Sequence, residues 1–227
     1  MIIYGKQPIL YIIKHHPLVL ESIYLAKECD KKLFSTIANT KVPIQRLDSM
    51  KAQALAKGGN HQGFLAKISN IDTVLVKELK EKESLLLLYG LTDMGNIGAI
   101  CRSAYALGVD GIIVSNVQNL KLDTIIRTSS GAAIALPIAH EVNAQTAINE
   151  LRQAGFTIYG ASAKGQSVKE VKFSKKRVLL LGSEGEGIPN KILSKCDKEI
   201  AIPMARAFDS LNVSAAAAIL CDRMSDG

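Results

Sequence analysis

From residue 84 onward, short apolar runs alternate with small-residue or amphipathic segments, and this alternation constrains the fold more than any other feature of the chain. Such alternation predicts a parallel sheet with helices on both of its faces. The predicted strands cover residues 85–89, 111–114, 138–139, 157–161, 177–181 and 199–202, and the predicted helices cover 97–107, 124–129, 143–153, 188–194 and 212–223. We therefore expect an α/β domain over residues 84–227, whose ligand lies at the carboxyl ends of the strands.

The first 70 residues predict a smaller α/β unit, and the charged run over 77–83 marks residues 71–83 as a linker. Helices are expected over 7–14, 31–37 and 49–55, and strands over 21–26, 43–47 and 64–68. Residues 1–80 hold 12 Lys and Arg against 6 Asp and Glu, a net charge of +6, whereas residues 81–227 hold 16 against 15. A basic module beside a near-neutral one favours a polyanionic partner such as RNA. The alternative is a generally basic protein of net charge +7 without such a partner.

Several classes of protein do not fit the sequence. Its longest apolar runs are much shorter than the roughly 18–20 residues that cross a bilayer, and its first residues lack the pattern of a secretory signal. The four cysteines stand apart, without a CxxC pair or the spacing of metal ligands. We expect reduced thiols, no metal, no membrane association and a cytoplasmic location.

Three loops that follow predicted strands carry the residues with chemical potential. The loop over 181–188 reads LGSEGEGI, and its glycines allow the backbone to bend sharply or to approach a ligand closely. It matches neither the dinucleotide fingerprint nor the phosphate loop. The loop over 93–103 carries Asn96, which suits a helix N-cap, and Arg102, which suits an ion pair or a phosphate contact. The loop over 202–216 places Ser210 and Asn212, each also a candidate cap, before an alanine-rich helix.

Taken together, NIGAICRSAYALG over 96–108, LGSEGEGI over 181–188, and IPM followed by SLNVSAAAAI over 202–219 resemble the three motifs of the TrmH/SpoU family. These enzymes are RNA ribose 2′-O-methyltransferases of the SPOUT group. The first 70 residues resemble the L30e-like substrate-binding domain of the longer members, through YGKQP over 4–8 and HQG over 61–63. The resemblance implies a deep trefoil knot in the C-terminal domain, a homodimer, S-adenosylmethionine as cofactor and RNA as substrate.

Within the family the chain is most similar to enzymes that methylate a guanosine ribose in 23S rRNA. A transfer RNA guanosine methyltransferase and a catalytically silent RNA-binding relative are the alternatives. By the same resemblance, Arg102 activates the 2′-hydroxyl. The residues implied around it are Asn96, Glu184, Ser210 and Asn212, and those implied around the cofactor are Gly182, Ile202 and Leu211, with Met204 and Ala215 as neighbours.

The proton of the 2′-hydroxyl has two candidate handlers. A guanidinium with a pKa above about 12 is rarely deprotonated, so Arg102 is equally suited to stabilising the forming alkoxide. Glu184 is then a candidate proton acceptor, and Glu186 a weaker one. The alternative for Glu184 is a structural carboxylate that caps the helix expected at residue 188.

Overall fold

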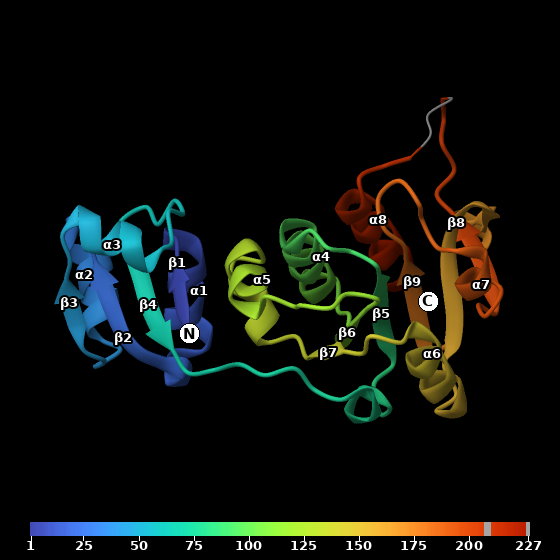
Figure 1. The fold of residues 1–227 in the computed structure, drawn as a ribbon, viewed down its shortest axis with the longest axis horizontal. Helices are drawn as coiled ribbons and strands as arrows, with labels where there is room; N and C mark the ends of the chain where they lie inside the picture. The colour runs from blue at the N-terminus through green and yellow to red at the C-terminus, as the bar shows by residue number, and fades with distance from the viewer. Residues whose placement is uncertain (207–209, 226–227) are drawn as a thin grey trace. The chain divides into compact units, whose positions relative to one another are not determined.

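The computed structural model describes residues 1–206 and 210–225 (Figure 1). The chain divides into two compact units. The first comprises Met1–Asp72 together with Lys121–Ala135, and the second comprises Thr73–Leu120 and Leu136–Gly227. Each unit has its own sheet, so each is described separately.

The first unit is built on a four-stranded sheet of order β1-β4-β2-β3. Strand β4 runs antiparallel to both of its neighbours, and β2 and β3 run parallel. The strands are β1 (Ile2–Tyr4), β2 (Leu20–Leu25), β3 (Ile44–Arg46) and β4 (Phe64–Ile68), and the helices are α1 (Lys6–His15), α2 (Lys31–Ala38), α3 (Ser49–Leu55) and α5 (Leu122–Thr128). A 3₁₀ turn, η1 (Pro17–Val19), joins α1 to β2, and another, η3 (Ala132–Ile134), follows α5.

The second unit is built on a six-stranded sheet of order β10-β8-β9-β5-β6-β7, in which every neighbouring pair is parallel. The strands are β5 (Ser84–Tyr89), β6 (Gly111–Ser115), β7 (Ile138–His140), β8 (Thr157–Ser167), β9 (Arg177–Leu181) and β10 (Lys198–Ala201). The helices are α4 (Met94–Ala106), α6 (Ala144–Gln153), α7 (Asn190–Leu193) and α8 (Val213–Ser225), with 3₁₀ turns η2 (Val76–Leu79) and η4 (Val168–Glu170). The parallel α/β architecture expected from residue 84 onward is confirmed.

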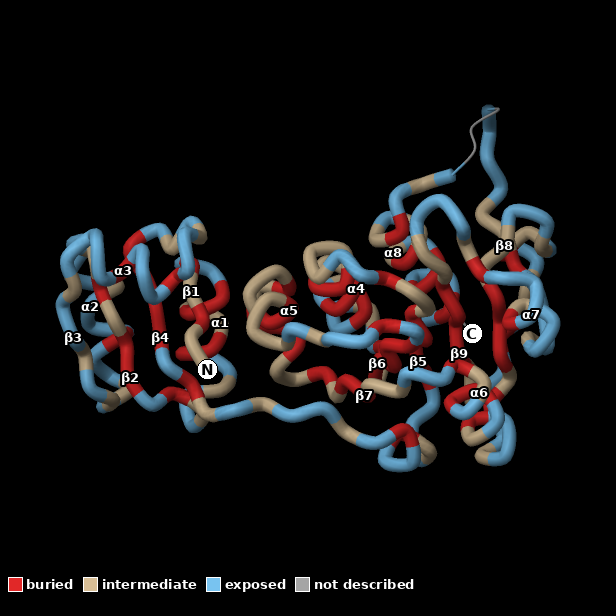
Figure 2. Tube along the Cα trace, in the orientation of Figure 1, coloured by how far each residue is buried: buried red, intermediate tan, exposed pale blue. Residues whose placement is uncertain are grey.

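Burial explains the apolar runs that predicted this sheet. Residues 85–88 of β5 and 178–180 of β9 are all inaccessible to solvent, because both faces of the sheet are covered (Figure 2). Leu85 and Leu87 pack in one core with α6, whereas Leu86 and Leu88 alternate to the opposite face. Helices α4 and α8 pack against each other, and Figure 1 draws them away from α6. A sheet covered in this way leaves the ends of its strands as the place for a site.

Four details differ from the sequence-based expectation. Strand β1 was not predicted. Strand β8 is six residues longer than expected. Part of the expected linker, η2, buries Val76 and Leu79 in the core with α6. Helix α4 begins earlier than expected, because Asp93 rather than Asn96 is its N-cap and accepts a hydrogen bond from the Gly95 amide at 2.7 Å.

Candidate active site

Two adjoining cavities lie at the carboxyl ends of β9, β8 and β10. The first, of about 730 Å³, is lined by the loop over 181–188, by residues 161–164 and by residues 210–213. The second, of about 490 Å³, is lined by residues 200–204 at the end of β10 and just after it, and shares part of the same wall. The residues common to both cavities are Ala161, Ser162, Ala163, Ser210, Leu211 and Ala216. This is the edge of the sheet where the strand order predicted a ligand.

A backbone contact shapes the glycine-rich loop. A Cβ atom added to Gly182 would lie 2.1 Å from the carbonyl carbon of Gly187 and 2.5 Å from the amide nitrogen of Ile188. The loop closes on itself through the Gly187 amide, which donates to the Ser183 carbonyl at 3.0 Å. Only glycine at position 182 permits this close approach, and the turned-back loop forms one wall of the larger cavity.

Three side chains from three distant segments meet beside this loop. The Asn212 amide donates to Glu184 Oε1 at 2.6 Å, and the Asn96 amide donates to the same oxygen at 3.2 Å. Asn212 also donates to Asn96 Oδ1 at 3.2 Å. We call Asn96, Glu184 and Asn212 the amide–carboxylate cluster. It joins the first turn of α4, the glycine-rich loop and the start of α8.

The hypothesis that these residues only cap helices has a different outcome for each of them. Asn212 caps α8, because its Oδ1 accepts from the Ser214 amide at 2.9 Å, and it contacts Glu184 through its other end. Asn96 lies inside α4 and does not cap it, since Asp93 has that role. Glu184 does not cap the following helix, since α7 begins at Asn190 and has no side-chain cap. The cap hypothesis is therefore right for Asn212 and wrong for Asn96 and Glu184.

The other expected site residues separate into two groups. Gly182, Glu184, Ser210, Leu211 and Asn212 line the larger cavity, and Ile202 and Met204 line the smaller one. Arg102 and Ala215 are exposed, and in the described part of the chain neither belongs to the lining of these cavities. Ala216, the neighbour of Ala215, faces both cavities.

The wall formed by residues 161–165 was not among the site residues predicted from the sequence. Strand β8 pairs Gly160 with Glu199 and then Gln166 with Ile200, so the five residues between lie outside the pairing with β10. They line the two cavities instead. The one sequence signal for this wall was the glycine at position 165. A Cβ atom there would lie 2.5 Å from the Ile200 amide nitrogen, so a glycine is needed where the strand rejoins β10.

The charged side chains that line the larger cavity are mainly acidic. Glu184, Glu186 and Glu199 lie there with a single lysine, Lys164. Apolar groups from Leu181, Ile188 and Leu211 share the wall. Such a site suits a ligand with an apolar part and a positive charge. Among residues 1–206 and 210–225, no group of three or more His, Cys, Asp or Glu side chains is arranged to hold a metal ion.

Comparison with protein families gives two matches. The model of the SpoU rRNA methylase family matches residues 83–222. The model described as RNA 2′-O ribose methyltransferase substrate binding matches residues 2–74. No helix in the described part of the chain is long and apolar enough to span a membrane.

Two curated proteins are similar over nearly their whole length. A TrmH family tRNA/rRNA methyltransferase of Staphylococcus aureus is 32% identical over 92% of this chain and 88% of its own. The 23S rRNA (guanosine-2′-O-)-methyltransferase RlmB of Pseudomonas putida is 28% identical over 96% of this chain and 92% of its own.

Two solved structures share the fold. The SpoU methyltransferase AviRb from Streptomyces viridochromogenes, in complex with AdoMet, gives a TM-score of 0.79 at 24% identity, over 100% of this chain and 89% of its own. An AdoMet-bound rRNA methyltransferase from Sinorhizobium meliloti gives a TM-score of 0.75 at 22% identity, over 98% of this chain and 85% of its own.

Proposed function

This chain belongs to the SpoU family of RNA methylases, and we propose that its target is the ribose 2′-hydroxyl of a guanosine in 23S rRNA. It is an RNA methyltransferase, and S-adenosylmethionine is its methyl donor. One observation carries the proposal: the amide–carboxylate cluster brings the three motifs together at the mouth of the glycine-walled cavity. The choice of 23S rRNA is supported by similarity to RlmB of Pseudomonas putida.

The two cavities fit the cofactor by shape and by charge. Gly182 supplies a backbone wall that a side chain would fill, and Ile202, Leu211 and Met204 supply apolar contact for an adenine ring. Glu186 and Glu199 offer carboxylates to the positive charges of the methionine part. When bound, S-adenosylmethionine supplies an activated methyl group, so the protein must align the acceptor and handle one proton.

We assign the proton to Glu184. Both amides of the cluster donate to its Oε1 and so fix the carboxylate. Neither of these two hydrogen bonds uses Oε2. Oε2 is then oriented to accept the proton of a ribose 2′-hydroxyl at the cavity mouth. Ser210, which lines both cavities, is placed to hold the ribose. Arg102 stabilises the forming alkoxide and the adjacent phosphate.

Arg102 serves this role from a second copy of the chain. It lies on the exposed side of α4, three residues before Tyr105, which is 42% exposed. Helix α8 packs beside α4 and exposes Ile219 by 39%. Exposed apolar side chains on two neighbouring helices favour a homodimer interface at this face. Arg102 would then enter the partner's site.

Four further features belong to this proposal. The knot is supported by the path of the chain, since β10 is the edge strand whereas α8, which follows it, packs against α4 and β9. The L30e-like domain over 1–70 is supported by the substrate-binding match over residues 2–74. The proposed boundaries are a linker over 71–83 and a methyltransferase domain over 84–227; the compact units differ from them, since the second unit begins at Thr73 and residues 121–135 group with the first. The proposed location is the cytoplasm.

The experiment is methyl transfer in vitro. Purified protein and S-adenosylmethionine are incubated with 23S rRNA, 16S rRNA and transfer RNA, all from a strain that lacks the gene. Ribose methylation is then mapped by resistance to alkaline cleavage. We expect one new 2′-O-methylguanosine in 23S rRNA. Methylation of transfer RNA alone would replace the proposed substrate, and absence of transfer to any RNA would refute the activity.

A further inference from the structure

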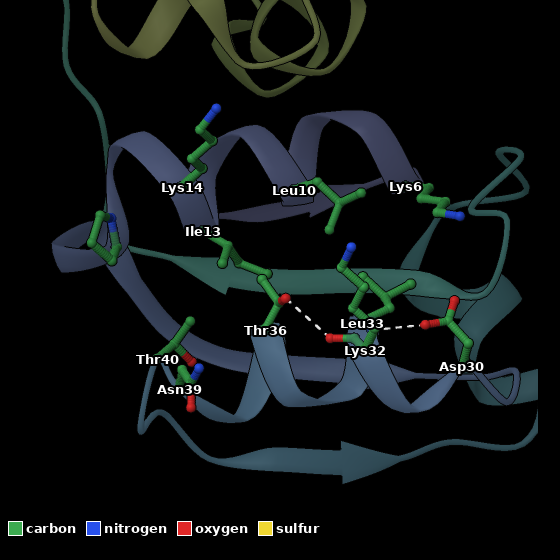
Figure 3. A pocket seen from close by; sticks show the side chains of 11 residues that line it. Lys6, Leu10, Ile13, Lys14, Asp30, Lys32, Leu33, Thr36, Asn39 and Thr40 are labelled. Carbon is green, nitrogen blue, oxygen red and sulfur yellow. Dashed lines mark hydrogen bonds between the residues drawn. The ribbon is translucent and has the colours of Figure 1, made fainter.

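A third cavity lies in the first unit, between α1 and α2, far in sequence from every motif of the methyl-transfer site. Its volume is about 670 Å³. Figure 3 shows side chains from both helices around it. Its lining comes from α1, from α2 and from the residues that flank these two helices.

The floor of this cavity consists of apolar side chains that a ligand is able to contact. Leu10 of α1 and Leu33 of α2 are both half-buried, and Ile13 closes the floor below them. Fully packed leucines would not be available to a ligand, whereas these two present part of their surface to the cavity. A flat apolar group therefore gains burial here.

The rim of the cavity is basic. Lys6 lies at the start of α1 and Lys32 extends from α2 toward α1, whereas the Lys14 side chain points away from α2 (Figure 3). Lys6 and Lys32 come from different helices, so they are able to contact different phosphates of one strand. The one carboxylate in the lining, Asp30, is engaged as the cap of α2, where its Oδ1 accepts from the Leu33 amide at 2.8 Å.

Two hydroxyl groups in the wall already donate hydrogen bonds to backbone carbonyls of α2. The hydroxyl of Thr36 donates to the Lys32 carbonyl at 3.1 Å, and that of Thr40 donates to the Ile37 carbonyl at 2.7 Å. Asn39 is exposed at the end of α2 and carries both a donor and an acceptor. An amide of this kind suits the edge of a nucleobase.

We propose that this cavity binds one nucleotide of the substrate RNA, separate from the nucleotide that is methylated. The base lies against Leu10 and Leu33, Asn39 contacts its edge, and the lysines hold the flanking phosphates. The proposal rests on the proposed function, because it assumes that the partner of this unit is RNA. The volume lies within the range of sites for small organic groups.

An acidic peptide is a weaker match to the same cavity. Peptide recognition in an extended form needs unpaired backbone groups, as at the edge of a sheet. The walls here are two helices, whose backbone groups are bonded within each helix. The base of a single-stranded nucleotide gains burial against an apolar surface, and its phosphates attract the lysines.

Two neighbouring lysines provide the test. Lys32 lines the cavity, whereas Lys31 is equally exposed on the same helix and is not part of the lining. The affinity of the full protein for 23S rRNA fragments is measured against salt for Lys32→Gln and Lys31→Gln. Loss of one phosphate contact lowers the salt slope by about 0.7–0.9. We expect Lys32→Gln to show that loss with several-fold weaker binding, and Lys31→Gln to match wild type. Equal behaviour of the two variants would overturn the proposal.

A second measurement tests the base contact. A single-stranded hexanucleotide is titrated into the labelled protein, and backbone amide shifts are followed by NMR. We expect shifts at Leu10, Ile13, Leu33 and Asn39 that an abasic strand of the same length does not produce. Equal shifts from the abasic strand, or stronger binding of polyglutamate, would also overturn it.

Failure of this inference is distinguishable from failure of the proposed function. The cavity variants leave the methyl-transfer site unchanged, so cofactor affinity is measured on the same samples as a control. Intact methylation of 23S rRNA with no difference between Lys32→Gln and Lys31→Gln rejects the nucleotide site alone. Absence of methylation by the wild-type protein rejects the proposed function.

Discussion

At the scale of residues, the site depends on a carboxylate held by two amides. Glu184 Oε1 accepts from both Asn96 and Asn212, so the side chain has one orientation although it is exposed. Only the family resemblance predicted that these three residues lie near one another. Their contact was not predictable from spacing, because Asn96 and Asn212 are 116 positions apart.

Glu184→Gln tests the proton transfer. The amide cannot accept the proton as a carboxylate does, so we expect methyl transfer to fall by on the order of a hundredfold or more, with cofactor affinity nearly unchanged. The measurement is single-turnover transfer to 23S rRNA. Glu186→Gln is the comparison variant, since Glu186 lines the same cavity from the same loop and is assigned to the cofactor: we expect weaker cofactor binding but most of the single-turnover rate at saturating cofactor. A fully active Glu184→Gln variant would leave Glu184 with a structural role only.

Gly182→Ala tests the closed loop. The added Cβ meets the backbone of Gly187 at 2.1 Å, so the loop must open, and we expect the cofactor Kd to rise at least about tenfold. Calorimetry measures the affinity. In the control Gly108→Ala, φ is +76° and no atom lies within 4 Å, so stability falls by about 1 kcal/mol while Kd stays the same. An unchanged Kd for Gly182→Ala would remove this loop from the cofactor site.

At the scale of elements, hydrophobic period and helix-start residues predicted most of the fold. The strands over 84–89 and 177–181 were found because burial on both faces requires continuous apolar runs. The break in the pairing of β8 with β10 over residues 161–165 was not predicted, because it depends on contacts with β10 rather than on a local pattern. The start of α3 is set locally: Asp48 is its N-cap, and its Oδ1 accepts from the Lys51 amide at 2.8 Å.

The interface of α4 and α8 predicts a dependence of stability on pH. Burial raises the pKa of Cys101 on α4 and of Cys221 on α8 to about 12 each. An unfolded thiol ionises near a pH of about 8.5, so the stability that these protonated thiols contribute is complete below that pH. It is lost as the pH rises from about 8.5 toward 12.

Urea denaturation between about pH 7 and pH 10 measures this effect. We expect the free energy of unfolding to decline above a pH of about 8.5 and the decline to be smaller in Cys101→Ala/Cys221→Ala. Alkylation at about pH 8 adds a second readout, in which the two thiols react only after unfolding. Rapid alkylation of either thiol in the folded protein would contradict the assigned burial.

At the scale of the whole molecule, the exposed position of Arg102 bears on the proposal that two chains share a site. The cavity, its glycine loop and the amide–carboxylate cluster are complete within one chain. Arg102 lies on the exposed side of α4, close in sequence to Tyr105. A homodimer through α4 and α8 would therefore have sites that each need two chains.

Mixed dimers test this composition. Arg102→Ala and Asn212→Ala chains are co-expressed with different tags, and the mixed dimer is purified through both. One of its two sites then has an intact Asn212 and receives Arg102 from the partner, so we expect up to half of wild-type activity from two inactive parents. If Arg102 acts within its own chain, both sites are defective and no activity returns.

The long separation within the amide–carboxylate cluster also governs when the enzyme becomes active. Asn212 lies 116 positions after Asn96 and 28 after Glu184, near the end of the described chain. During translation the first two residues leave the ribosome well before the third, and chains are made at about 5–20 residues per second. A nascent chain therefore carries its RNA-binding unit for several seconds before it has a catalytic site, so methylation begins only after synthesis has passed the third motif.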